Sequence, residues 1–270
     1  MEEQILSVTK LINALLGKPV LALLAALHIR PENPEYPIPN HVAMELVVFL
    51  VAIVFFTWLK GRLSVDCPGG AQQCMEALLT NSMGVGARDL LEDIAGHGAV
   101  RYLPMLGSIG MFVLMSNLIS LVPGFSSPTA QNSVPLGCAI VVFLYYNWSG
   151  LRQHGPLGYG KHFLGPTVAL APIMLPIEIV SNLARLLSLT VRLWVNMVVS
   201  ELLYATFLGL TLALFLFAGK LSPLGYALAP VPLLVPCIFI LLHVFVGFLQ
   251  AFVFTLLPII YVGGAVGEEH

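Results

Sequence analysis

The chain has 270 residues, of which 58% are hydrophobic and only 10% charged, and its mean hydropathy is +0.91. Soluble domains carry roughly 25% charged residues, so water is not the main solvent of this chain. The formal net charge is -2 and Lys and Arg form no cluster, which excludes nucleic acid as a partner, while the length allows about five or six membrane crossings.

The four cysteines predict neither a zinc site nor a disulfide framework. Cys67 and Cys74 are seven residues apart without a second pair or nearby histidines, whereas Cys138 and Cys237 lie inside apolar runs. We therefore expect no metal and no cofactor.

The N-terminal segment lacks the pattern of a cleaved secretory signal. Glu2 and Glu3 come first, and Pro19 interrupts the apolar stretch that follows. We expect residues 11–29 to lie along the membrane interface or against the rest of the protein. Residues 1–40 are interpreted as an N-terminal non-cytoplasmic segment, followed by a single membrane domain over residues 41–270.

Three ordinary spans are predicted in this domain. They cover residues 42–59, 103–122 and 134–148. Basic residues follow the first span (Lys60 and Arg62) and the third (Arg152), so the positive-inside rule places both loops in the cytoplasm and the N-terminus in the periplasm. Residues 75–94, between the first two spans, predict a broken amphipathic helix on the cytoplasmic surface.

Two further apolar stretches are too long for ordinary spans. Residues 167–219 would form a helix of roughly 78 Å, against a hydrocarbon core of about 30 Å. Neither Pro nor Gly occurs from residue 177 to residue 208, which favours one strongly tilted helix over two spans. A turn at residues 220–225 leads to a last helix over residues 226–262, expected to begin irregularly because three prolines precede residue 237.

The predicted fold class is therefore all-α and integral to the membrane. It comprises one N-terminal span, a surface amphipathic helix, a helical hairpin and two long, strongly tilted antiparallel helices. The C-terminus is then cytoplasmic.

Arg192 lies near the middle of the first long helix, where a charged side chain costs several kcal/mol in lipid. At 100° per residue it shares one face with other polar residues, within a sector about 80° wide. They are Glu178, Ser181, Arg185, Ser188 and Asn196. Glu201 faces the opposite side. The pattern indicates an ion path, and the alternative is a snorkelling or structurally paired arginine.

The last helix carries His243 and Gln250 on one face, seven residues apart. If Arg192 lies opposite Gln250 and Glu201 lies opposite His243, both pairs place the hairpin tip near residue 221 or 222, where the sequence has its turn. A Glu and a His that face each other at membrane depth can hold and pass a proton.

Several of these segments resemble subunit a of bacterial F-type ATP synthases. The similar segments are LLSLTVRLWVNMVVSE (186–201), PIE (176–178), HVFVGFLQAFVF (243–254), NLISLVPG (117–124), PTAQN (128–132) and PIPN (37–40). The resemblance covers residues 37–270, and the arginine segment is the most specific part of it.

The resemblance implies a stator subunit that provides two proton half-channels beside a rotating ring of c subunits, without a catalytic site of its own. Arg192 would face the ring carboxylates, with Gln250 and Asn196 near it. Glu201 and His243 would line the half-channel from the periplasm. The implied partners are the c-ring, the peripheral-stalk b subunits, the remainder of the synthase and lipid, in the bacterial inner membrane.

Glu178 would lie near the cytoplasmic exit, and Arg185, seven residues further along the same face, is expected to pair with it.

The chain departs from the usual sequence of that family at two positions. Many relatives have glycine before the asparagine and before the glutamate, where this chain has Val195 and Ser200. Close approach of helices at these two points is therefore in question.

Two other classes of protein could also carry ionisable residues inside the membrane. A secondary transporter with a midplane ionisable site predicts inverted repeats and discontinuous helices, but no internal repeat is visible and Arg192 lies in the least interrupted helix. An intramembrane enzyme is a third class, but neither HExxH nor GxSxG occurs. Glu201 and His243 favour protons as the coupling ion, although the ring carboxylate would decide between protons and sodium.

Overall fold

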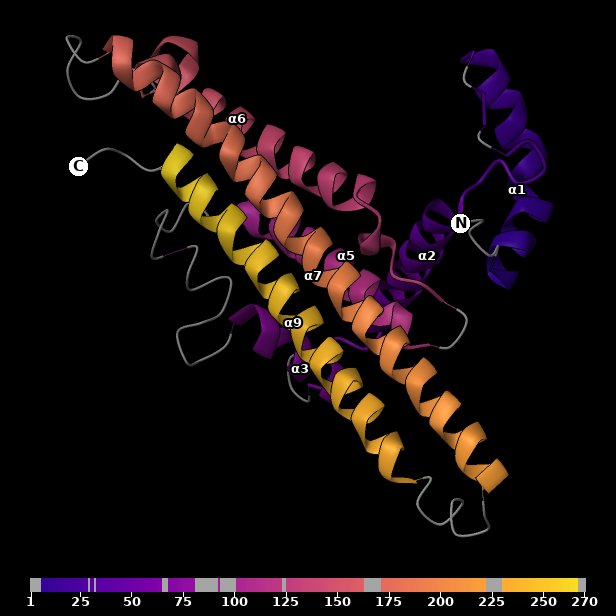
Figure 1. The fold of residues 1–270 in the computed structure, drawn as a ribbon. Coiled ribbons are helices and arrows are strands. Elements are labelled where there is room, and N and C mark those ends of the chain that lie inside the picture. The colour runs from indigo at the N-terminus through magenta and orange to yellow at the C-terminus, as the bar shows by residue number, and fades with distance from the viewer. Residues whose placement is uncertain are drawn as a thin grey trace. The chain divides into compact units, whose positions relative to one another are not determined.

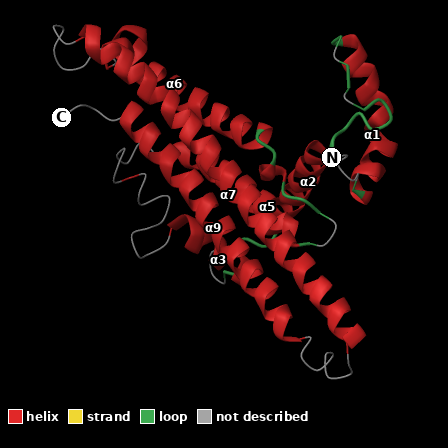
Figure 2. Cartoon of the chain, viewed as in Figure 1, coloured by secondary structure: helices red, strands yellow, loops and turns green. Residues whose placement is uncertain are grey.

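The computed structural model describes residues 6–28, 30–31, 33–64, 68–80, 92, 101–122, 125–162, 171–221 and 230–266. Every regular element among these residues is a helix, and no strand occurs among them (Figure 2). The α-helices are α1 (Ser7–Ala26), α2 (Asn40–Lys60), α3 (Gly70–Thr80), α5 (Leu103–Leu118), α6 (Ser133–His162), α7 (Ala171–Leu221) and α9 (Pro230–Val266), and two 3-10 helices are η2 (Ile119–Leu121) and η3 (Pro128–Ala130) (Figure 1). The predicted all-α fold is confirmed.

Six helices of the described chain are long and apolar enough to cross a membrane. Five of them, α2, α5, α6, α7 and α9, cover the stretches predicted as spans or long helices. The sixth is α1, which we expected along the interface or against the protein, but whose 20 residues also match the length of a span. Of the predicted surface helix over residues 75–94, α3 covers the first residues, and residues 81–91 and 93–94 lie outside the described part.

Helix α6 continues well beyond the predicted end of the third span at residue 148. It runs for 30 residues to His162, with one non-helical residue, Gly155, at φ 70° and ψ 169°. The predicted loop around Arg152 is thus helical, because glycine takes a positive φ without strain and Pro156 suits the first position of the helical segment that follows.

Helix α7 is a single helix of 51 residues, as predicted, although it contains Pro176. At 1.5 Å per residue it is about 77 Å long, more than twice the thickness of a hydrocarbon core of about 30 Å. Its tilt against the membrane stays a prediction.

Helix α9 begins more regularly than expected. The structure is helical from Pro230, so the irregular start that we predicted as far as Pro236 is wrong for the described residues. Pro230 and Pro232 lie in the first turn, where the backbone N–H groups have no partner inside the helix. Of the three prolines at this end of α9, only Pro236 therefore removes a regular hydrogen bond.

Contacts divide the chain into two compact units, which we describe separately. The first comprises Met1–Ala52, Leu114–Gln131 and Val195–Phe248, and the second comprises Ile53–Val113, Asn132–Trp194 and Leu249–His270. Helices α7 and α9 each contribute one part to each unit. In both units the two helices lie side by side (Figure 1).

The α7 and α9 contacts follow an antiparallel register in each unit. In the first unit, the rings of Phe207 and Phe239 stack with centroids 4.2 Å apart. In the second unit, the Arg185 guanidinium lies 5.4 Å from the centre of the Tyr261 ring. As the residue number on α7 rises, its partner's number on α9 falls, which agrees with the hairpin predicted from the two polar pairs.

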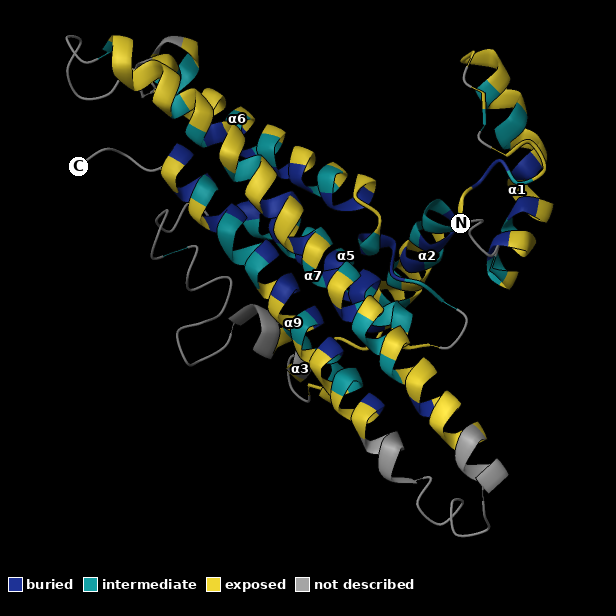
Figure 3. Ribbon diagram, viewed as in Figure 1, coloured by how far each residue is buried: buried dark blue, intermediate teal, exposed yellow. Residues whose placement is uncertain are grey.

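The outer surfaces of the long helices are apolar. Figure 3 shows exposed residues along most of α7, and these include Leu187, Val191 and Leu202. The buried core of the second unit is formed by aliphatic and aromatic side chains, among them Leu189, Leu193, Phe254, Ile259 and Val262. Large apolar side chains on the outside suit lipid, where the helix satisfies its own backbone polar groups.

Asn13 attaches helix α1 to the segment that precedes α2. Its side-chain amide donates to the carbonyl oxygen of Ile38 at 2.9 Å, and its side-chain oxygen accepts from the backbone N–H of Ile38 at 3.0 Å. Asn13 and Ile38 are 8% and 3% exposed. One side chain therefore pairs both backbone groups of a buried residue 25 positions away.

Replacing Asn13 by alanine is expected to destabilise the first unit by about 1–3 kcal/mol, because the buried N–H and C=O of Ile38 lose their partners. The midpoint of thermal unfolding in detergent measures this. Asn33→Ala is the matched control, since Asn33 bonds only the nearby N–H of Glu35 and does so in solvent. Equal midpoints for the two variants would contradict the attachment.

Candidate functional site

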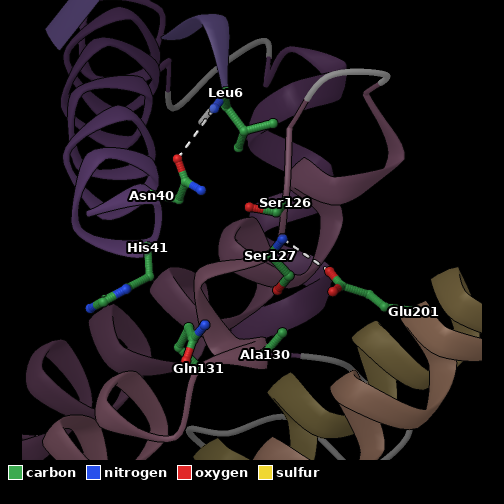
Figure 4. A pocket seen from close by; sticks show the side chains of 8 residues that line it. All are labelled: Leu6, Asn40, His41, Ser126, Ser127, Ala130, Gln131 and Glu201. Atoms are coloured by element: carbon green, nitrogen blue, oxygen red, sulfur yellow. Dashed lines mark hydrogen bonds between the residues drawn. The ribbon is translucent and has the colours of Figure 1, made fainter. Parts of the chain in front are cut away.

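Glu201 lies on α7 at the edge of a pocket in the first unit. Its Oε1 accepts a hydrogen bond of 3.0 Å from the backbone N–H of Ser127, in the loop before η3 (Figure 4). The pocket has a volume of about 240 Å³ and is lined by Leu6, Asn40, His41, Ser126, Ser127, Ala130, Gln131 and Glu201. A carboxylate on a long apolar helix is thus accessible from a polar cavity that is large enough for several water molecules.

His243 is buried on α9 in the same unit, with 4% of its surface exposed. Its Nδ1 lies 2.9 Å from the hydroxyl of Ser200, and its Nε2 lies 2.9 Å from the hydroxyl of Ser120. Nε2 is also 3.2 Å from the carbonyl oxygen of Asn117. We expected His243 opposite Glu201, and the described hydrogen bonds join it to the preceding residue, Ser200.

Asn117 connects the His243 environment to the loop that binds Glu201. Its side-chain oxygen accepts from the Thr129 hydroxyl at 2.7 Å, and its side-chain amide donates to the carbonyl oxygen of Gly247 at 3.3 Å. The Thr129 and Ser127 hydroxyls are 2.6 Å apart. Neither Asn117 nor these hydroxyls were assigned roles from the sequence, although a polar run at the end of an apolar span is a signal for such a network.

Arg192 is exposed on α7 in the second unit. Its guanidinium donates a long hydrogen bond of 3.4 Å to the hydroxyl of Ser188, and it forms no ion pair with any carboxylate in the described part of the chain. Leu187 and Val191, next to it on the same helix, are exposed as well. Arg192 is therefore an exposed cation flanked by exposed apolar side chains.

The other predicted residues near Arg192 differ in their burial. Gln250 is buried on α9 in the second unit, at 3% exposure, and Asn196 is half-buried on α7, one helical turn beyond Arg192. The predicted pairing of Arg192 with Gln250 stays a prediction.

Glu178 and Arg185 form an ion pair in the second unit, with 3.9 Å between Nη2 and Oε1. The pairing predicted from their spacing is confirmed. Arg185 also lies over the ring of Tyr261 on α9. Both side chains of the pair remain more than one third exposed, so the pair contributes little stability by itself.

A polar network surrounds this ion pair. The Tyr146 hydroxyl donates to the side-chain oxygen of Asn182, and the Asn182 amide donates to the side-chain oxygen of Asn147 at 3.3 Å. The hydroxyl of Tyr159 donates to the same oxygen of Asn147 at 3.0 Å. The enclosed pocket has a volume of about 20 Å³, enough for one water molecule, and Glu178 and Arg185 are among its lining residues.

Two glycines of α6 allow Tyr159 to reach this network. The positive φ of Gly155 lets α6 change direction after residue 154. Gly150 leaves room for the Tyr159 ring, because a methyl group at Gly150 would overlap that ring and come within 2.9 Å of the carbonyl oxygen of Ala265.

Gly150→Ala is therefore expected to destabilise the second unit by about 1–3 kcal/mol through overpacking. Gly137→Ala is the control on the same helix, since a methyl group there meets nothing within 4 Å, and it is expected to be neutral or slightly stabilising. Thermal unfolding of the two variants in detergent checks the difference. A Gly150→Ala protein as stable as Gly137→Ala would rule out the close approach.

Among the described residues, no group of three or more His, Cys, Asp and Glu side chains could hold a metal ion. The ionisable groups instead lie singly or in pairs on two long apolar helices. Together with the six candidate spans, they define a polytopic α-helical membrane protein with ionisable side chains within its spans.

Comparison with known proteins identifies the family. The family model described as ATP synthase A chain matches residues 42–263, so the chain belongs to this family. It is 39% identical over 262 residues to ATP synthase subunit a of Koribacter versatilis, with 97% of each chain covered. It is 44% identical over 234 residues to that of Solibacter usitatus, covering 87% of this chain and 90% of the relative. The resemblance found in the sequence is thereby confirmed.

Proposed function

We propose that the chain is the proton-translocating stator subunit of a rotary ATP synthase and provides two half-channels to the carboxylates of a c-ring. The observation that carries this proposal is Arg192, an exposed cation on the long, largely apolar helix α7, without a described carboxylate partner. A charge in that position is costly in lipid unless a partner of opposite charge meets it. A ring of subunits that each carry one carboxylate supplies such a partner repeatedly.

The chemistry of arginine suits this role. A guanidinium is not deprotonated in a protein, so Arg192 stays cationic whichever ring subunit faces it. Its charge favours the ionised form of a passing carboxyl group and so releases the proton. The same charge opposes direct proton passage between the two half-channels, and the current is then coupled to ring rotation.

The half-channel from the periplasm would begin at the pocket in front of Glu201. Six of the eight residues that line this pocket are polar, and Glu201 is half-buried at its wall (Figure 4). His243 lies in the same unit, among hydroxyl groups. Water in the pocket would deliver protons to Glu201 and from there to the neighbourhood of His243, before they reach the ring.

The half-channel to the cytoplasm would end near Glu178. Its carboxylate is one third exposed and belongs to the small polar pocket of the second unit. Arg185 lies 3.9 Å from this carboxylate and positions it in the pocket. Gln250 and Asn196 would contribute polar groups close to Arg192.

The driving force is adequate in size, since each elementary charge gains about 2.3 kcal/mol per 100 mV of membrane potential. Several charges are thus needed per ATP, and the catalysis of ATP synthesis takes place in other subunits.

The partners would be the c-ring, the peripheral-stalk b subunits and the remainder of the synthase. The chain would lie in the bacterial inner membrane with a periplasmic N-terminus and a cytoplasmic C-terminus.

A secondary transporter is the alternative function. It predicts helices that are interrupted at the ionisable site. Helix α7 instead runs without interruption from Ala171 to Leu221, with Arg192 inside it. A transporter would also work alone in liposomes, whereas a stator subunit conducts protons only together with its ring.

Arg192→Ala is expected to abolish ATP-driven proton pumping while the synthase still assembles, because the ring carboxyl groups then lose the charge that ionises them. Arg192→Lys keeps a positive charge but loses the planar donor geometry, and we expect a large loss as well. A pH-sensitive dye in membrane vesicles measures pumping. Arg152→Ala is the control, since Arg152 is exposed on α6 and lines neither pocket. Normal pumping by Arg192→Ala would refute the proposal.

Glu201→Gln and His243→Ala are each expected to lower the pumping rate by about a hundredfold or more, the size typical of removing one proton-transfer group. The ATPase activity of the detached catalytic sector should be unchanged, which separates transport from catalysis. The same dye assay reports both variants. If both pump at the wild-type rate, the path from the periplasm does not pass through this unit.

A further inference from the structure

Both ring nitrogens of His243 have hydroxyl groups beside them. Nδ1 lies 2.9 Å from the Ser200 hydroxyl, and Nε2 lies 2.9 Å from the Ser120 hydroxyl. His243 and Ser200 are 4% and 9% exposed. In such a buried place, every protonation state of the ring needs hydrogen-bond partners, because an unpaired polar atom is costly.

The hydrogen on Nε2 can be assigned from its neighbours. Nε2 lies 3.2 Å from the carbonyl oxygen of Asn117, and a carbonyl oxygen can only accept a hydrogen bond. The Ser120 hydroxyl can donate to the same carbonyl oxygen, at 3.1 Å, and its own oxygen then accepts from Nε2. We therefore assign a hydrogen to Nε2 in the neutral ring as well as in the charged ring. The proton that His243 gains or loses is consequently the one on Nδ1, on the side of Ser200.

Ser200 has the geometry to serve both charge states. Its hydroxyl oxygen is 2.9 Å from Nδ1 and also 3.1 Å from the carbonyl oxygen of Met197, to which it can donate. When the ring is neutral, the hydroxyl donates to the lone pair of Nδ1. When the ring is charged, the Nδ1–H group donates to the hydroxyl oxygen, and the hydroxyl hydrogen turns to Met197. Both arrangements leave all these atoms paired.

We propose that Ser200 is a positioning residue whose hydroxyl, by turning between His243 and Met197, lets the buried histidine bind and release a proton. The inference rests on the proposed function, in which His243 belongs to the proton path. In uptake, a hydronium ion of the half-channel gives up a proton, an N–H bond forms at Nδ1 and the ring gains one positive charge. Release breaks the same bond, and the O–H bond of Ser200 is kept throughout.

Among the described residues, the groups in hydrogen-bond contact with the ring are uncharged. They are the Ser200 hydroxyl on α7, the Asn117 carbonyl on α5 and the Ser120 hydroxyl on η2. Glu201, the carboxylate next to Ser200 in the chain, bonds instead to the backbone of Ser127. The hydrogen bond between Ser200 and Nδ1 therefore directly affects the proton affinity of the His243 ring.

The test compares Ser200→Ala with Ser200→Thr in vesicles that carry the assembled synthase, with ATP-driven pumping followed over a range of pH. Alanine removes the hydroxyl, and the charged ring loses more than the neutral ring because hydrogen bonds to charged groups are the stronger ones. Protonation then needs a lower pH. We expect the alkaline limb of the Ser200→Ala profile to move to lower pH by about one unit, with a several-fold lower rate at neutral pH, whereas Ser200→Thr keeps the wild-type profile.

A wild-type rate and profile for Ser200→Ala would overturn the inference. A Ser200→Thr profile shifted as far as that of Ser200→Ala would also overturn the inference, because the change would then come from packing and not from loss of the hydroxyl. Should Ser200→Ala not assemble, Ser200→Cys decides the question, because its thiol keeps the size and weakens the hydrogen bond: a partial shift supports the inference, and an unchanged profile overturns it. His243→Ala and Arg192→Ala in the same assay test the proposed function separately.

Discussion

The exposed charge of Arg192 on a long, largely apolar helix is the constraint on which the rest of the structure depends. A guanidinium in lipid is costly, and it cannot lose its charge to escape that cost. It must therefore be held at one depth and met from outside the chain. Helix α7 provides the support, since its 51 residues form one continuous element and its neighbour α9 lies beside it in both units. A break near Arg192 would let the side chain move to the membrane surface instead.

The buried polar groups of the first unit are arranged around short side chains. Asn117, Ser127 and Thr129 hold the loop that binds Glu201, and Ser120 and Ser200 hold His243. Hydroxyl and amide groups of this size reach their partners without long flexible stems, so they lose little conformational entropy when they are fixed. They can also act as donors or acceptors, which a site that handles protons requires.

Much of the fold and of the candidate site could be predicted from the sequence, because lipid imposes simple rules on length and polarity. The uninterrupted long helix, the ion pair of Glu178 and Arg185 and the antiparallel register all follow from spacing. What could not be predicted depends on contacts between distant segments. The two hydroxyl partners of His243 come from separate stretches of the chain, Ser120 from η2 and Ser200 from α7. The sequence singled out Ser200 only because many relatives have glycine at that position.

The continuation of α6 and the regular start of α9 were not predicted, because both depend on where single Gly and Pro residues fall within a helix. Basic residues near Arg152 suggested a loop, yet the helix continues to Gly155 and resumes after it. Prolines suggested an irregular start for α9, yet two of the three lie in its first turn, where they cost little.

The attachment of α1 has a practical consequence for handling the protein. Leu6, just before α1, lines the pocket in front of Glu201, and its backbone N–H donates to the side chain of Asn40 at 3.3 Å. An affinity tag or fluorescent fusion added before Leu6 would be tethered within a few residues of that opening. Purification handles and labels are therefore better fused elsewhere, where their bulk does not compete with water for access to the carboxylate.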